Sequence, residues 1–167
     1  MFRRLSVQSR GLTAREAAKG TGGGGGLEYT IDQVAGQTIT DPEGTLYDDG
    51  GPDGTYSKTD YTTYIQPPAG QQVQITMKAF EMGSVGGGSF NEKLRFFNID
   101  NGSGGAIVVN FYGSTANGDS TAPTANQVIL GVVGATVTII FDQSGYYGED
   151  GFFTQGDAGF ELEWEFV

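Results

Sequence analysis

A chain of 167 residues is long enough for one domain of ordinary size with a core of its own. Its 37% hydrophobic and 12% aromatic residues exclude a disordered chain, and no apolar run reaches the ~20 residues that a transmembrane helix needs. The absence of histidine and cysteine excludes Ser-His-Asp and Cys-His nucleophile systems, histidine-ligated metals and disulfide bonds, and the net charge of −11 disfavours nucleic acid and anionic membranes as partners.

The N-terminal residues differ from the rest of the chain in charge and composition. Residues 1–19 contain five cations and one anion, a net charge of +4, whereas residues 20–167 contain four cations and nineteen acids, a net charge of −15. The five cations are Arg3, Arg4, Arg10, Arg15 and Lys19. Residues 20–26 are glycine except for Thr21, which predicts a flexible joint. We therefore expect an extended, basic, glycine-jointed arm at residues 1–26 and a folded domain at residues 27–167.

Two interpretations of this arm remain open. Its five cations are either assembly residues that dock on an acidic surface of a neighbouring subunit, or part of a solvated tail. Residues 12–19 also carry a short helical signature, with Thr13 as N-cap and Glu16 at the capping-box position. The first ten residues lack the apolar segment of a secretory signal, so no export leader is expected.

Alternating apolar and polar residues predict strands along the rest of the chain. The expected strands cover residues 37–40, 61–66, 73–79, 94–98, 107–111, 137–141 and 160–166. In the last of them, apolar residues occupy the even positions and glutamates the odd ones, which predicts one buried face and one carboxylate-lined face. Glycine-rich turns separate these strands, and no helix of normal length is visible in the body. The pattern predicts an all-β fold, an antiparallel two-sheet sandwich.

The order of motifs from residue 39 to residue 166 resembles that of CUB-like domains. The opening is Gly-Thr-Leu-Tyr-Asp-Asp-Gly-Gly-Pro-Asp-Gly-Thr-Tyr at residues 44–56, followed by Tyr-Thr-Thr-Tyr-Ile at residues 61–65. The closing pair is Val-Thr-Ile-Ile-Phe at residues 137–141 and Gly-Phe-Glu-Leu-Glu-Trp-Glu-Phe at residues 159–166. The resemblance is to the cysteine-poor type of bacterial and phage surface proteins. It implies a jelly-roll-like sandwich that serves recognition, adhesion or assembly without catalysis.

Two sets of residues are candidate binding sites. The resemblance implies a calcium site whose nearest counterparts here are Glu81, Glu92 and Asp142. Acids in glycine turns, as in residues 48–54, independently suit Ca²⁺, although Asp-Gly is also simply a favourable turn sequence, and both interpretations remain open. The second set consists of loop aromatics that suit a carbohydrate or protein contact, or alternatively cap the core: Tyr146, Tyr147, Phe152 and Phe153.

Catalysis is not expected from this sequence. The glutamates at residues 161, 163 and 165 read more simply as a solvated or partner-facing stripe than as paired catalytic acids, and no Gly-Lys-Ser/Thr follows the glycine tract. Two functions remain open. One is a structural subunit of a large assembly, such as a virion component (phage capsid decoration, tail or fibre), homo-oligomeric or particle-bound through its arm. The other is a bacterial cell-surface or secreted adhesion module that binds glycan or protein through its loops, with or without calcium.

Overall fold

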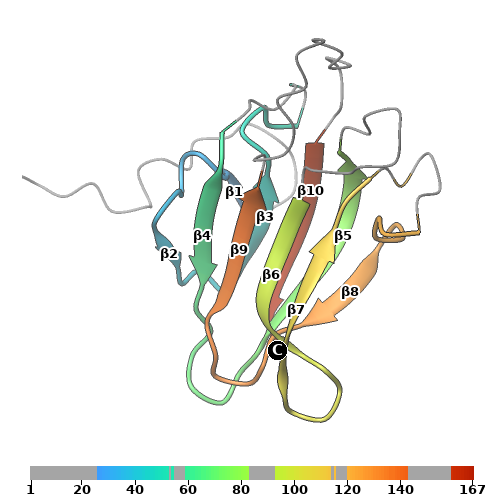
Figure 1. Ribbon diagram of the computed structural model, residues 1–167. Helices are drawn as coiled ribbons and strands as arrows, with labels where there is room; N and C mark the ends of the chain where they lie inside the picture. Colours follow the sequence, from blue (N-terminus) through green and yellow to red (C-terminus); the bar gives the residue numbers. More distant parts are fainter. Residues whose placement is uncertain are drawn as a thin grey trace, which may run out of the picture.

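The described part of the protein is a two-layered β-sandwich (Figure 1). The computed structural model describes residues 26–52, 54, 59–82, 93–113, 115, 120–142 and 159–167. These residues form ten strands: β1 (Leu27–Thr30), β2 (Thr38–Ile39), β3 (Glu43–Tyr47), β4 (Tyr61–Ile65), β5 (Val73–Glu81), β6 (Lys93–Asp100), β7 (Ala106–Phe111), β8 (Gln127–Leu130), β9 (Val137–Asp142) and β10 (Gly159–Phe166). No helix within these ranges could cross a membrane. The all-β sandwich expected from the sequence is confirmed.

Each sheet has five strands, and most neighbours are antiparallel. Sheet A has the order β1-β3-β10-β5-β8, and sheet B has the order β2-β4-β9-β6-β7. The expectation of an antiparallel sandwich needs one refinement, because β1 runs parallel to β3 and β2 runs parallel to β4. The chain passes from β1 in sheet A to β2 in sheet B, back to β3 and on to β4. The chain reverses direction twice before it returns to the same sheet. As a result, β3 runs in the direction of β1, and β4 runs in the direction of β2.

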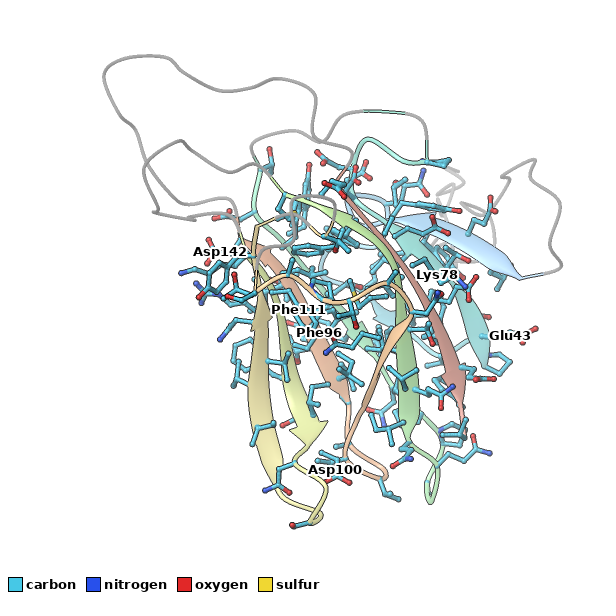
Figure 2. The ribbon with its side chains drawn as sticks, turned by 90° about the vertical axis from the view of Figure 1, so that its right-hand side faces the viewer. Glu43, Lys78, Phe96, Asp100, Phe111 and Asp142 are labelled. Carbon is cyan, nitrogen blue, oxygen red and sulfur yellow. The ribbon has the colours of Figure 1, made fainter. Side chains whose placement is uncertain are left out.

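Aromatic side chains fill the space between the two sheets. Phe141 of sheet B meets Phe160 of sheet A edge to face, with ring centroids 5.3 Å apart. Phe111 makes similar contacts with Phe96 and with Phe80, at 5.9 and 6.1 Å. Such pairs add about 0.5–1.5 kcal/mol each to the burial of their apolar area. Figure 2 shows Phe96 and Phe111 between the layers.

The alternation expected from the sequence changes phase at two positions. Ala79, expected to face the core with Met77, is exposed, and Phe80 is buried instead, because the register between β5 and β10 shifts there. Asn98, expected to share a face with Phe96, is exposed in a β6 bulge with a φ of 62°, and Ile99 takes the buried position. A bulge inserts one extra residue and so moves every following side chain to the opposite face.

Candidate functional site: an acidic hollow on sheet A

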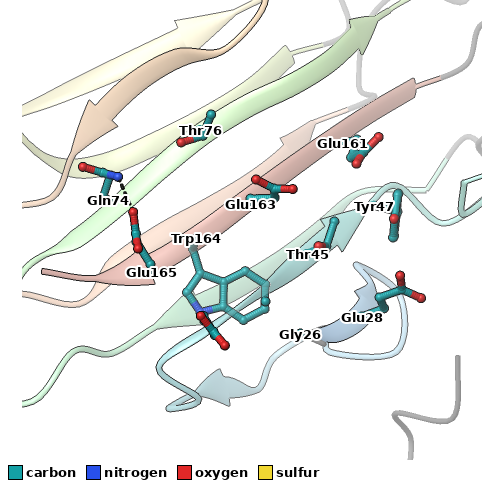
Figure 3. A pocket seen from close by; sticks show the side chains of 12 residues that line it. Gly26, Glu28, Thr45, Tyr47, Gln74, Thr76, Glu161, Glu163, Trp164 and Glu165 are labelled. Carbon is teal, nitrogen blue, oxygen red and sulfur yellow. Dashed lines mark hydrogen bonds between the residues drawn. The ribbon is translucent and has the colours of Figure 1, made fainter. Parts of the chain in front are cut away.

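The outer face of sheet A is hollowed where β1, β3, β10 and β5 lie side by side (Figure 3). The hollow has a volume of about 540 Å³. Its lining consists of Gly26, Glu28, Glu43, Gly44, Thr45, Tyr47, Gln74, Thr76, Glu161, Glu163, Trp164 and Glu165. Five of these twelve residues are glutamates from three different strands, so the hollow is a carboxylate-lined surface.

Strand alternation and register bring these glutamates together. Phe160, Leu162 and Trp164 point into the core, which leaves the three glutamates of β10 on the outer face, as the sequence predicted. The register places Glu165 directly opposite Glu43 of β3. Thr45 of β3 pairs with Glu28 of β1 on one side and with Glu163 of β10 on the other, so the three residues form one row across three strands. Like charges directly opposite each other destabilise a sheet, so this arrangement is not explained by folding alone.

Few groups on this face compensate the negative charge. The Lys78 ammonium lies 3.3 Å from a carboxylate oxygen of Glu163, and the Gln74 amide donates a hydrogen bond of 2.5 Å to Glu165. Five carboxylates and one ammonium leave the face with a formal charge of −4. Partial burial raises the pKa of Glu161, and the negative charge of Glu163 raises it further, while Lys78 opposes the change. The hollow therefore favours a cationic ligand.

The sheet beneath the hollow is held in place by the indole of Trp164. Its Nε1 donates a hydrogen bond of 3.1 Å to the carbonyl oxygen of Asp41, and the ring is only 2% exposed. A Cβ added to Gly44 would lie 2.3 Å from the indole, so glycine is required there for the ring to lie against β3. Tyr29 packs beside the indole at 5.8 Å and donates a hydrogen bond to the Asp41 carboxylate. These contacts fix the position of the indole beneath the hollow.

The first described residue of the chain lies at this hollow. Gly26 lines it, and β1 begins at the next residue. The sequence before Gly26 is the glycine joint and, beyond it, the segment with a net charge of +4. A basic segment and an acidic surface are therefore separated along the chain only by the joint.

Comparisons with known proteins address the fold of this domain. No protein-family model matches the sequence, and neither does any curated protein. Solved structures do match. The CUB1-EGF-CUB2 domains of rat MASP-1 superpose with a TM-score of 0.58 at 18% identity, over 83% of this chain and 43% of that one. The fold is CUB-like. The corresponding human MASP-1/3 structure gives a TM-score of 0.56 at 19% identity, over 76% of this chain and 42% of that one.

A third similar structure is the full extracellular region of zebrafish Gpr126/Adgrg6. It gives a TM-score of 0.53 at 22% identity, over 78% of this chain and 14% of that one. The CUB-like chain thus spans less than half the length of each of these three structures. The resemblance inferred from the motifs is confirmed for the fold.

The structure describes two of the three expected calcium residues. Glu81 ends β5, and Asp142 ends β9 on the opposite sheet, where it forms an ion pair with Arg95 (Figure 2). Glu92 lies outside the described residues. The described ranges contain no group of three or more acidic side chains that could hold a metal. A calcium site on Glu81, Glu92 and Asp142 stays a prediction.

The other expected site residues lie outside the part of the chain that the structure describes. They are the loop aromatics Tyr146, Tyr147, Phe152 and Phe153, and the arm cations Arg3, Arg4, Arg10, Arg15 and Lys19. Sequence reasoning found the glutamate stripe of β10 but not the contributions of Glu28 and Glu43. β1 and β3 are too short to show the alternation of apolar and polar residues that would predict an outward-facing carboxylate at Glu28 or Glu43.

Asp48 has a structural role that its position in an acidic glycine turn did not reveal. It is fully buried, and its carboxylate accepts hydrogen bonds from the backbone N–H groups of Gly50 at 2.6 Å and Phe160 at 3.0 Å. Burial raises its pKa to about 6, against the lowering effect of these hydrogen bonds, and neighbouring Asp49 adds to the rise. The carboxylate ties the end of β3 to the start of β10.

Proposed function

We propose that this chain is a non-enzymatic assembly protein in which the acidic hollow of one CUB-like domain binds the basic N-terminal arm of a neighbouring copy. The observation that carries the proposal is the hollow itself, where, among the described residues, five glutamates lie with the single lysine Lys78. In this proposal, residues 1–26 are the arm and residues 27–167 the displayed domain. The protein is a structural subunit of a large particle, of which a virion component (phage capsid decoration, tail or fibre) is the leading example.

Charge and reach support docking of the arm. The face carries −4 and residues 1–19 carry +4, so the two surfaces match in sign and magnitude. Four of the five arm cations are arginines, whose planar guanidinium groups form bidentate hydrogen bonds with carboxylates. The seven residues of the joint, 20–26, extend to about 25 Å, which lets the arm leave its own domain for a neighbour. Binding also removes the repulsion between Glu43 and Glu165.

The mass of the full-length protein in solution tests this proposal. At about 20 mM salt we expect light scattering to give a larger mass than at about 0.5 M salt, because the Debye length falls from about 20 Å to a few ångströms. Replacing the three β10 glutamates together with glutamine (E161Q, E163Q, E165Q) should abolish this salt-dependent increase in mass.

A matched control removes three charges outside the hollow, by D32N, D60N and D100N. This control should keep the increase in mass at low salt. The proposal is contradicted if the full-length chain has the same mass at both salt concentrations, or if the hollow variant and the control show the same increase at low salt.

The second candidate function is a cell-surface or secreted adhesion module that binds glycan or protein through its loops. It is supported by the zebrafish neighbour, which is described as an extracellular region, and by the acids in glycine turns, which suit calcium. Its binding residues would be the loop aromatics Tyr146, Tyr147, Phe152 and Phe153. A glycan array read with and without millimolar Ca²⁺, on the parent and on a variant with these four residues changed to alanine, tests it. Binding that the variant loses supports this function, and the absence of binding contradicts it.

A further inference from the structure

Strand β7 is an open edge of the sandwich. It is the last strand of sheet B, and within the described residues it pairs only with β6 (Figure 1). Its first five residues, 106–110, are exposed except for Val109, which is partly buried. An edge strand of this kind presents a row of backbone N–H and C=O groups that can pair with another strand.

Within the described residues, β7 lacks the sequence features that usually protect an edge. Its sequence, Ala-Ile-Val-Val-Asn-Phe, contains no charge, no proline and no glycine, and the bulge opposite it belongs to β6. The other edges differ: β2 has two residues, β8 has four, and β1 carries Glu28. Charges and short length are the features by which proteins keep edges from pairing. Of the four edges in the described part, β7 is the one that combines length, neutrality and β-branched residues.

Apolar side chains are exposed on both faces of this edge. Ile107 is 42% exposed and Val108 is 48% exposed, and successive residues of a strand point to opposite faces. A strand added beside β7 would therefore cover apolar area on the inner and the outer face of sheet B together, while its backbone groups pair with those of β7.

We propose that β7 pairs in antiparallel fashion with β7 of a second copy, which joins the two B sheets into one continuous sheet about a two-fold axis. With the axis at Val108, Val108 faces Val108 of the partner copy, and Ile107 faces Val109. Ala106 then faces Asn110, so every pair is neutral. A contact of this kind uses the same surface on both copies and closes as a dimer.

The register of β7 with itself selects a second copy as the partner, because pairing about Val108 places only neutral residues opposite each other. The chain has a net charge of −11, so two copies repel each other across most of their surfaces and meet most easily at a neutral one. The glutamates of the acidic hollow lie on β1, β3 and β10, none of which pairs with β8, the other edge of sheet A. The β7 edge lies at the β8 end, since Ile99 of β6 forms a bridge with Gly131 just after β8. Pairing through β7 therefore brings two acidic molecules together at a neutral surface and keeps their hollows apart.

A single cysteine tests this register, because the natural chain has none. Residues directly opposite each other in an antiparallel pair have Cα atoms about 4.5–5.5 Å apart, within the range of about 4.4–6.8 Å that a disulfide spans. We expect full-length V108C to form a disulfide-linked dimer under mild oxidation. The matched control is V128C on β8, where the valine is 50% exposed. It should cross-link at least about tenfold more slowly. Equal rates for the two variants overturn the proposal.

A non-covalent experiment separates this contact from binding of the arm. Sedimentation at about 0.5 M salt screens the attraction between arm and hollow but not strand pairing. Under these conditions the mass of the full-length chain should rise toward a dimer as concentration increases. V108K should remain a monomer, and V128K should behave like the parent. A parent that stays monomeric at about 1 mM, or a V108K variant that associates like the parent, overturns the pairing and leaves the arm proposal untouched.

Discussion

Replacing Gly159 with alanine should destabilise the domain more than its backbone conformation alone explains. Gly159 begins β10 with a φ of 73°, which costs an alanine about 1–2 kcal/mol. The added Cβ would also lie 1.9 Å from an oxygen of the buried Asp48 carboxylate. The carboxylate would have to move and would lose its hydrogen bond from Phe160, and a hydrogen bond to a charged group is worth about 1.5–3 kcal/mol. We therefore expect G159A to lose about 3–5 kcal/mol.

The control for backbone strain is G36A. Gly36 has a nearly identical φ of 72°, and a Cβ there meets nothing within 4 Å. Urea unfolding followed by the fluorescence of the single tryptophan, Trp164, gives both free energies of unfolding. G36A should lose only about 1–2 kcal/mol.

A double-mutant cycle completes this test. In a D48A background the space beside residue 159 is open, so G159A should then cost no more than G36A. The reasoning is refuted if G159A and G36A are equally stable in the parent background, or if the cost of G159A does not change when Asp48 is removed.

Three further predictions concern pH, core packing and calcium. The raised pKa of Asp48, about 6 against the ordinary 3.8, means that the folded protein binds its proton more tightly than the unfolded chain. This contribution to stability is full below about pH 4, is lost as the pH rises through about 6 and amounts to about 3 kcal/mol. D48N, whose side chain does not titrate, should remove this pH dependence, as urea unfolding at several pH values would show. W164A should lose about 3–5 kcal/mol of unfolding free energy in urea unfolding followed by far-ultraviolet circular dichroism, since this variant has no tryptophan, and a variant as stable as the parent would contradict the packing. If Glu81, Glu92 and Asp142 hold calcium, millimolar Ca²⁺ should raise the melting temperature of the parent but not of E92Q; no rise in the parent contradicts the site.

Strands with one solvent-exposed face could be predicted from the sequence, and three short strands, β1, β3 and β8, could not. The pattern of residues 160–166 specifies the buried and exposed faces of β10, because side chains alternate along any strand whatever its neighbours are. β1, β3 and β8 have four or five residues each, too few for a clear period. In β3 the pattern is also interrupted by Gly44, which is required by the indole of Trp164, a residue far along the chain.

The candidate site divides in the same way. The outward glutamates of β10 were predicted correctly, since their placement depends only on local alternation. That Glu28 and Glu43 join them follows from strand order and register, which depend on which strands meet across the whole chain. The burial of Asp48 likewise depends on a hydrogen bond to Phe160, 112 residues later.

The sequence by itself determined the all-β class, the separation of charge between residues 1–19 and the rest, and the absence of histidine and cysteine chemistry. These properties follow from composition and short-range periodicity. Only the tertiary structure decided the parallel edge pairs, the two changes of phase, the acidic hollow and the neutral edge at β7. Each of these depends on contacts between segments that are distant in sequence, because strand order and register determine which side chains are buried and which are exposed to solvent.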